Sequence, residues 1–200
     1  KNARGYTIPL DKRLAADGAN VVLTYSASAD KANDVVKDIV NKGGKAFAVK
    51  ADSGNEQDVR NAVEETVKKF GGLDILVNNA GIAIAGTTED YASNDFDRMI
   101  NVNVKSIFIA AQAASKYLQE GGRIINIGSI MSDYAIFPGM TVYTMTKGAV
   151  AGLTRGLARD FGARGITVNN VQPGPIDTDM NPSDGPAGDM QRSMIPLGRY

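Results

Sequence analysis

The 200-residue sequence contains no cysteine and no histidine. Without cysteine, the chain can form no disulfide, thiolate nucleophile or thiolate metal site, which fits a cytoplasmic protein. Without histidine, a Ser-His-Asp hydrolase and a His-ligated zinc site are also excluded, and no metal site is predicted. Proton transfer must therefore use tyrosine, lysine, aspartate or glutamate side chains.

Charge and hydropathy argue against two further kinds of partner. The 22 basic and 22 acidic residues balance, which gives no reason to expect nucleic acid or an anionic membrane. No apolar run approaches the roughly 20 residues that a membrane-spanning helix needs. Hydrophobic residues make up 43% of the chain, enough for a sizeable core, so residues 1–200 are predicted to form a single domain.

Strand and helix patterns alternate along the chain. The expected strands are apolar runs, at 19–26, 45–51, 73–77, 123–128 and 166–171. The expected helices have apolar residues at helical spacing, at 29–42, 56–70, 96–119 and 142–164. This alternation predicts an α/β fold, a doubly wound, Rossmann-type parallel sheet with helices on both faces. Because the chain opens on a loop-like stretch, we expect the domain to be incomplete at both ends and to lack the first strand.

The strongest motif is Tyr143-Thr-Met-Thr-Lys147, with Ser129 at the end of a predicted strand. Residues i and i+4 lie on one face of a helix, so the Lys147 ammonium can approach the Tyr143 phenol. A phenol with a pKa of about 10 is a poor base at neutral pH, and a nearby cation lowers that pKa. Ser129 lies at the carboxyl edge where open α/β sheets bind ligands, and its hydroxyl could hold a carbonyl oxygen. Taken alone, a tyrosine and a lysine at this spacing also occur by chance on surfaces.

Other polar motifs occur at the same edge. They are NNAG at 78–81, Asn103 within NVNV, and PGPIDT at 173–178. With Ser129 and the motif at 143–147, they stand in the order and approximate spacing of short-chain dehydrogenases/reductases. The sequence resembles this family over essentially all of its 200 residues, and is most similar to 3-oxoacyl-carrier-protein reductases.

The resemblance implies a catalytic role for each of four residues. Tyr143 would be the acid/base, and Lys147 would lower its pKa and bind the nicotinamide ribose. Ser129 would orient and polarise the substrate carbonyl. Asn103 would kink its helix and hold a water in the proton relay.

The resemblance also implies a cofactor site along the strand ends. Asn79 and its two neighbours would pack on the adenosine side, and Asp52 would contact adenine, whereas Asn79 could instead stabilise the sheet and Asp52 cap a helix. The residues expected to contact the cofactor are Arg4, Gly5, Ser26, Asp52, Ser53, Asn79, Ala80, Gly81, Tyr143, Lys147, Pro173, Gly174, Ile176 and Thr178.

The cofactor is predicted to be NADP(H), with NAD(H) as the alternative. An acidic residue at the end of the strand 19–26 would bind the ribose 2′-hydroxyl and favour NAD. This chain has Ser26 there instead, with Arg4 expected nearby, and these groups suit a 2′-phosphate. In the alternative interpretation, Ser26 only terminates the strand.

The glycine loop departs from the family pattern T-G-x-x-x-G-x-G. Gly5 aligns with the middle glycine, whereas Lys1 and Thr7 replace the first and the last. These glycines allow the backbone to approach the pyrophosphate at a helix N-terminus, and the side chain of Thr7 should crowd that approach. Three interpretations stay open: weak or absent cofactor binding, a rearranged loop, or a poorly defined stretch over the first dozen residues. The family pattern resumes at Lys12, which favours the third.

The leading hypothesis is an NADPH-dependent carbonyl reductase for a 3-oxoacyl group or a small ketone, reversible in direction. The alternative is a non-catalytic nucleotide-binding or regulatory protein on the same scaffold, and an epimerase or dehydratase is a third option. Residues 130–140 and 180–195 would form an apolar substrate pocket, although its methionine and aromatic side chains could equally belong to the core or a subunit contact. A homotetramer is expected, with small residues of the two long helices packed between subunits.

Overall fold

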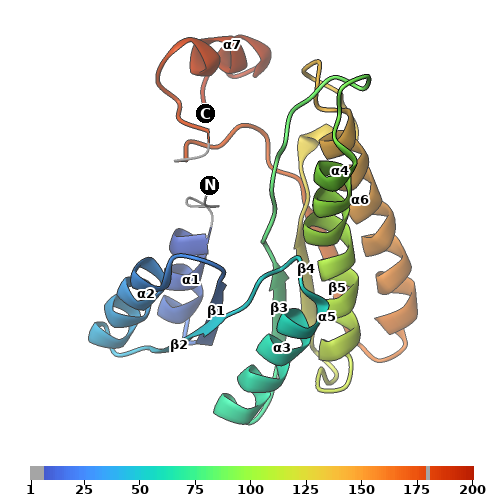
Figure 1. Ribbon diagram of the computed structural model, residues 1–200. Coiled ribbons are helices and arrows are strands. Elements are labelled where there is room, and N and C mark those ends of the chain that lie inside the picture. Colours follow the sequence, from blue (N-terminus) through green and yellow to red (C-terminus); the bar gives the residue numbers. More distant parts are fainter. Residues whose placement is uncertain (1–6, 179–180) are drawn as a thin grey trace.

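Strands and helices alternate in the structure (Figure 1), a computed structural model that describes residues 7–178 and 181–200. The helices are α1 (Thr7–Ala16), α2 (Ala29–Asn41), α3 (Glu56–Phe70), α4 (Ser93–Ile100), α5 (Ser106–Ala114), α6 (Thr141–Gly162) and α7 (Pro186–Met194), with a π-helical turn η1 (Asn101–Lys105) and a 3-10 turn η2 (Ile130–Ser132). The strands are β1 (Asn20–Tyr25), β2 (Lys45–Lys50), β3 (Ile75–Asn78), β4 (Arg123–Ile127) and β5 (Thr167–Val171).

The strands form two parallel sheets. One pairs β1 with β2, and the other has the order β3-β4-β5. In a doubly wound sheet of order 3-2-1-4-5-6, the second and third strands lie on one side of the first, and the fourth to sixth on the other. The two sheets match these two groups, with β1 as the second strand and β3 as the fourth. The predicted Rossmann-type fold is thus confirmed.

Helices cover both faces of the β1–β2 sheet. Ala46 and Ala48 of β2 pack in the apolar cluster formed with α2, whereas the ring of Phe47 points the other way, 5.3 Å from Nζ of Lys69 on α3. The β3-β4-β5 sheet buries one face, where Ile124 packs against α5 and α6. Its strands carry exposed side chains on the other face, among them Ile75 at 40% and Val171 at 49%.

The larger core cluster joins α3, α5, α6 and the β3-β4-β5 sheet. The alanines of α5 are almost fully buried. They are Ala110, Ala111, Ala113 and Ala114. The expectation that these alanines pack between subunits is therefore wrong, because each is buried within its own chain. Of the other small residues in that expectation, Ala149 is exposed, and Ala151 and Gly152 are half-buried.

Helix α3 has the predicted bounds because both of its ends carry clear signals. The Asn55 side chain caps the first turn by accepting hydrogen bonds from the backbone N–H groups of Gln57 and Asp58. Gly71 ends the helix in the left-handed conformation, at a φ of 83°, which glycine adopts without strain.

One predicted boundary is wrong. The helix expected over 96–119 runs instead from Ser93 to Ala114 through α4, η1 and α5. Helix α1 begins at Thr7, and Pro9 is tolerated in its first turn, where the missing N–H has no intrahelical partner to lose. Helix α7 begins at Pro186, a residue suited to the first helical position.

Candidate active site

Helix α6 brings Tyr143 and Lys147 to the carboxyl end of β4. Nζ of Lys147 lies 5.6 Å from the centroid of the Tyr143 ring. The same atom donates a hydrogen bond of 2.9 Å to the backbone oxygen of Ile127, the last residue of β4. Lys147 is 7% exposed, and this burial lowers the pKa of its ammonium to about 8. Lys147 therefore places a positive charge next to the Tyr143 phenol. Its lowered pKa means that the ammonium of Lys147 can also lose its proton near neutral pH.

Ser129 lies two residues after the end of β4 and caps the turn η2. Its Oγ accepts a hydrogen bond of 3.1 Å from the backbone N–H of Met131, and the residue is 9% exposed. The next residue ties this turn to a second strand end, because the N–H of Ile130 donates to the oxygen of Pro173 at 3.0 Å. Since Oγ is occupied as an acceptor of the Met131 N–H, the hydroxyl hydrogen stays able to donate to a substrate oxygen.

Asn103 lies in the π-helical turn η1 and is almost fully buried. Its Oδ1 accepts from the N–H of Ile82, and its Nδ2 donates to the oxygen of Ile82, both at 2.9 Å. Nδ2 also lies 3.2 Å from Oγ1 of Thr146, which donates to the backbone oxygen of Tyr143 at 2.8 Å. Asn103 thus links the segment after β3 to the helix that carries Tyr143, and the interruption of α-helical geometry falls at the residue expected to kink its helix.

Gly81 completes this cluster. A Cβ atom at this position would lie 3.5 Å from Oδ1 of Asn103 and 3.8 Å from Nζ of Lys147. These separations place residue 81 in contact distance of both functional groups. The NNAG segment, η1 and α6 therefore converge at one point, as the positions of their motifs in the sequence predict.

The other residues expected to contact the cofactor lie at strand ends. Ser26 follows β1 and is exposed. Asp52 follows β2, where its Oδ1 accepts from the N–H of Gly54 at 2.8 Å and its own N–H donates to Oδ2 of Asp58 at 2.9 Å. Asp52 thus holds the turn before α3, whereas the cap of α3 is Asn55. Arg4 and Gly5, as well as Lys1, lie outside the described residues.

The segment after β5 is held by its own turn. The N–H of Thr178 donates to the oxygen of Asn181 at 3.2 Å, and the Asn181 N–H donates back at 3.0 Å. Ile176 is 42% exposed, and Pro173 is fixed through its oxygen to Ile130. The loop 173–178, whose residues are expected to contact the cofactor, therefore starts beside Ser129.

Sequence reasoning missed the buried polar side chains that support these groups. They are Thr146, Asn126 and Thr154, each at most 6% exposed. Polar residues on the apolar stripe of α6 were the available signal, because Thr146 and Thr154 lie one turn on either side of the buried Val150.

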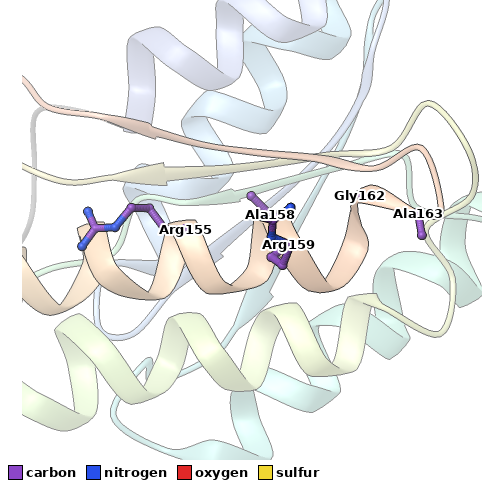
Figure 2. Close-up of a pocket in the computed structure, with 5 residues that line it drawn as sticks. All are labelled: Arg155, Ala158, Arg159, Gly162 and Ala163. Carbon is purple, nitrogen blue, oxygen red and sulfur yellow. The ribbon is translucent and has the colours of Figure 1, made fainter.

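Two surface hollows lie away from this cluster. One, of about 610 Å³, is on the outer surface of α6 between Arg155 and Ala163 (Figure 2). Arg155 is twelve residues beyond Tyr143, or about 18 Å along the helix axis. A second hollow, of about 440 Å³, includes Phe96 of α4 and Met145 of α6, but none of the four predicted catalytic residues. The candidate site is defined by the buried lysine and its hydrogen-bond partners, and neither hollow is lined by the four predicted catalytic residues.

The expected substrate wall is largely exposed. Met131 is 7% exposed, but Tyr134 is at 66%, and Met190 and Met194 of α7 are at 46% and 48%. Met180 lies outside the described residues. None of the helices over residues 7–178 and 181–200 is long and apolar enough to cross a membrane.

This arrangement, a doubly wound sheet with a tyrosine and a buried lysine side by side at its carboxyl edge, is that of an α/β oxidoreductase. Residues 3–187 match the family model of short chain dehydrogenases, and the chain is a member of that family.

Three known proteins illustrate the relationship. The Cyclic-di-GMP-binding biofilm dispersal mediator protein of Escherichia coli (strain K12) is 44% identical over 198 residues, which cover 99% of this chain and 80% of that protein. The 3-oxoacyl-[acyl-carrier-protein] reductase FabG of Staphylococcus aureus (strain Mu50) is 37% identical, with 99% and 81% covered. A short chain dehydrogenase from Burkholderia cenocepacia J2315, solved in complex with NADP, is 50% identical and has a TM-score of 0.96, with 98% and 80% covered.

Proposed function

We propose that this protein is an NADPH-dependent carbonyl reductase that converts a 3-oxoacyl group or a small ketone to a secondary alcohol, reversibly. The observation that carries the proposal is the buried Lys147 ammonium beside the Tyr143 ring, with Ser129 at the end of the adjoining strand. The relative from Staphylococcus aureus, a 3-oxoacyl-[acyl-carrier-protein] reductase, supports the choice of substrate class.

The strand-end residues fit an NADP(H) cofactor. A hydroxyl at Ser26, exposed at the end of β1, stands where an acidic residue would favour the 2′-hydroxyl of NAD. Further along the site, Gly81 offers no side chain between Asn103 and Lys147. The cofactor would be held by Ser26, Asp52 and Ser53 on the adenosine side, by the segment 79–81 in the middle, and by Lys147 with the loop 173–178 on the nicotinamide side. The Burkholderia structure with NADP supports this choice.

In the proposed reaction, bound NADPH supplies the hydride. The Ser129 hydroxyl donates a hydrogen bond to the substrate carbonyl oxygen while its Oγ accepts the Met131 N–H. The Tyr143 phenol donates its proton to the same oxygen as the alcohol forms. Lys147 has three N–H donors, one of which is used by Ile127, so two remain for the ribose and for the proton relay. The Lys147 charge stabilises the phenolate left on Tyr143.

Activity assays on the purified protein test this proposal. We expect NADPH oxidation with acetoacetyl-coenzyme A or ethyl acetoacetate, and a kcat/KM for NADPH well above that for NADH. A clear preference for NADH would overturn the cofactor assignment. Absence of turnover on both ketones, with NADPH bound, would overturn the reductase assignment.

A nucleotide-binding, regulatory function is the second candidate, because one relative is named a cyclic-di-GMP-binding protein. Calorimetric titration with cyclic-di-GMP separates the two. Micromolar binding in a protein that turns over neither ketone would favour this candidate, whereas turnover without binding would remove it.

We also propose a homotetramer and a cytoplasmic location. Phe96 and Phe108, on α4 and α5, are 40% and 46% exposed, and Met145 of α6 is 42% exposed. Large apolar side chains on neighbouring helices support a subunit contact on this side of the molecule. Light scattering at micromolar concentration tests the assembly, and a monomer would refute it.

A further inference from the structure

A chain of hydrogen bonds joins helix α6 to the sheet beneath the proposed catalytic pair. Nδ2 of Asn78 on β3 donates to Oδ1 of Asn126 on β4 at 2.8 Å. Nδ2 of Asn126 donates to Oγ1 of Thr154 on α6 at 2.9 Å, and this hydroxyl donates to the backbone oxygen of Val150 at 2.7 Å. Asn126 is fully buried, Thr154 is 6% exposed and Asn78 is half-buried. Three elements that each carry a part of the site are thus connected by side chains that lie largely out of the solvent.

These polar groups lie in an otherwise apolar layer. Ile124 precedes Asn126 on the same face of β4, Val168 lies on the neighbouring strand, and Leu157 follows Thr154 on α6; all three belong to the apolar core. Burying an amide costs free energy unless its hydrogen bonds are replaced, and apolar residues of similar volume would fill the space without that requirement. A fully satisfied buried network specifies one arrangement of the elements that it connects.

The network and the catalytic lysine are attached to adjacent residues of β4. The Asn126 side chain holds Thr154, and the backbone oxygen of the next residue, Ile127, holds Nζ of Lys147. Thr154 follows Lys147 by seven residues, which is two helical turns on the same face, or about 10 Å along the axis. Two contacts at this separation fix both the rotation of α6 and its position along its own axis.

We propose that Asn126 and Thr154 are positioning residues that hold α6 so that Lys147 and Tyr143 face the strand end. They touch neither substrate nor cofactor, and they act through the helix. The inference rests on the proposed function only for its turnover readout. A displacement of α6 by a fraction of an ångström would lengthen the Lys147–Ile127 contact and move the ammonium relative to the phenol, a change to which proton transfer is sensitive.

The test compares Thr154→Val with Thr154→Ser. Valine keeps the shape of threonine and removes the hydroxyl, whereas serine keeps the hydroxyl. Thr66→Val on α3 is the matched control, since the Thr66 hydroxyl also donates to the carbonyl four residues earlier, at 2.7 Å, far from the site. The double variant Asn126→Leu/Thr154→Val removes both partners of the Asn126–Thr154 hydrogen bond and leaves only the half-buried Nδ2 of Asn78 without its acceptor, which largely separates fold stability from positioning.

Two readouts are measured on each variant. The first is kcat and KM with NADPH and acetoacetyl-coenzyme A. The second readout is the absorbance titration of Tyr143, which needs neither ligand. It is obtained as the difference between each variant and the same variant carrying Tyr143→Phe.

We expect Thr154→Val to lower kcat about tenfold, with less than a twofold change in KM, and to raise the titration midpoint of Tyr143. In Thr154→Ser and Thr66→Val, kcat and KM should stay within twofold of the wild type.

The double variant decides the matter. We expect it to regain thermal stability but to keep the low kcat and the raised midpoint of Tyr143. Recovery of both readouts together with stability would show that the network is only structural and would overturn the proposal. If the wild type reduces no ketone, the proposed function fails, and the Tyr143 midpoint alone still decides the positioning role.

Discussion

The two halves of the molecule treat buried polar groups differently. Seven polar side chains are classed as buried among the residues whose side chains the structure describes, and six of them lie between Asn103 and Thr154. Each of these six takes part in a hydrogen bond, as in Asn103 with Ile82 and Asn126 with Thr154. The seventh, Asp11 on α1, lies in the N-terminal half, and its Oδ2 is buried without a hydrogen-bond partner. Two side-chain oxygens of the other half, Oγ1 of Thr144 and Oδ1 of Asn170, also have no partner, but these belong to half-buried residues.

The difference has consequences for both halves. In the half with α6, the hydrogen bonds of the buried residues hold the proposed catalytic residues in one arrangement, so the proposed site is organised before any ligand arrives. In the half with α1 and α2, the core is apolar and the ionic contacts are on the surface, such as Lys12 with Asp38. Burial without a partner raises the pKa of Asp11 to about 7, which makes this half sensitive to pH. Substitutions in each half should therefore act on different properties.

The largest effect is expected from Tyr143→Phe, which removes only the hydroxyl. Loss of a general acid lowers turnover by about a thousandfold. Affinity for NADPH and thermal stability should change little, because the ring and its contact with Lys147 remain. Steady-state kinetics and a fluorescence titration with NADPH measure the two properties. Tyr134→Phe, at a tyrosine that is 66% exposed, is the control and should keep full turnover.

Near-normal turnover in Tyr143→Phe would contradict the acid/base role and place the proton donor elsewhere in the cluster. Loss of NADPH affinity alongside turnover would instead indicate that the phenol hydroxyl mainly binds the cofactor.

The sequence predicts these residues because they form local motifs, and it misses what supports them because that support is tertiary. Tyr143 and Lys147 are one helical turn apart, so their proximity follows from helix geometry alone. Asn78 and Asn126 are 48 residues apart and meet only through the register of β3 and β4. The helix over 56–70 was predictable from Asn55 and Gly71, whereas a π-helical turn at Asn103 breaks the 3.6-residue spacing on which the prediction of 96–119 depended.

The burial of Asp11 is a second feature that depends on tertiary packing and was not predicted from the sequence. Nothing in the sequence around this aspartate indicates that its side chain is buried. In the structure, α1 begins at Thr7 and carries Asp11 to a buried position, with 8% exposure. The burial of this carboxyl depends on how α1 packs on its neighbours, and no local pattern reports that packing.

The next effect is expected from Asp11→Asn, and it concerns stability. The folded-state pKa of Asp11, about 7, is above the ordinary value of 3.8, so folding favours the protonated form. Its contribution is fully present below pH 4 and is lost as the pH rises to 7. The wild type should lose about 3 kcal/mol of stability between pH 4.5 and pH 8 from this group alone. Asp11→Asn, which cannot ionise, should be more stable than the wild type at pH 8 and similar to it at pH 4.5.

Urea unfolding at the two pH values measures the difference. Asp17→Asn is the control, because Asp17 is exposed and paired with Arg13 at 2.9 Å, and its loss should change stability little at either pH. An equal effect of Asp11→Asn at both pH values would show that Asp11 is charged and satisfied in the folded protein.

A smaller effect is expected on activity, through the pH dependence of Lys147 in the half with α6. Burial lowers the pKa of Lys147 to about 8, from an ordinary 10.5, so its ammonium is present below pH 8 and is lost above it. Without the ammonium, the phenolate formed on Tyr143 loses its stabilising charge, and ketone reduction should fall about tenfold per pH unit above 8. The profile of kcat at saturating NADPH measures this, with circular dichroism to confirm that the fold persists. A flat profile from pH 7 to 10 would mean that the cofactor or the substrate keeps Lys147 charged.

The smallest effect is expected at the start of α1, where the N-terminal half meets the proposed cofactor. Helix α1 begins at Thr7, and the N-terminus of a helix presents unpaired backbone N–H groups to an anion such as a pyrophosphate. A glycine at position 7 has no Cβ, so the backbone can approach the phosphates more closely. Thr7→Gly should therefore tighten NADPH binding about threefold to tenfold. Since glycine costs up to about 1 kcal/mol in a helix, thermal stability should fall slightly at the same time.

Thr66→Gly on α3 carries the same helical cost without the phosphate contact, and its NADPH affinity should be that of the wild type. Unchanged affinity in Thr7→Gly would place the pyrophosphate away from α1, and the departure from the family's glycine pattern would then have no bearing on cofactor binding.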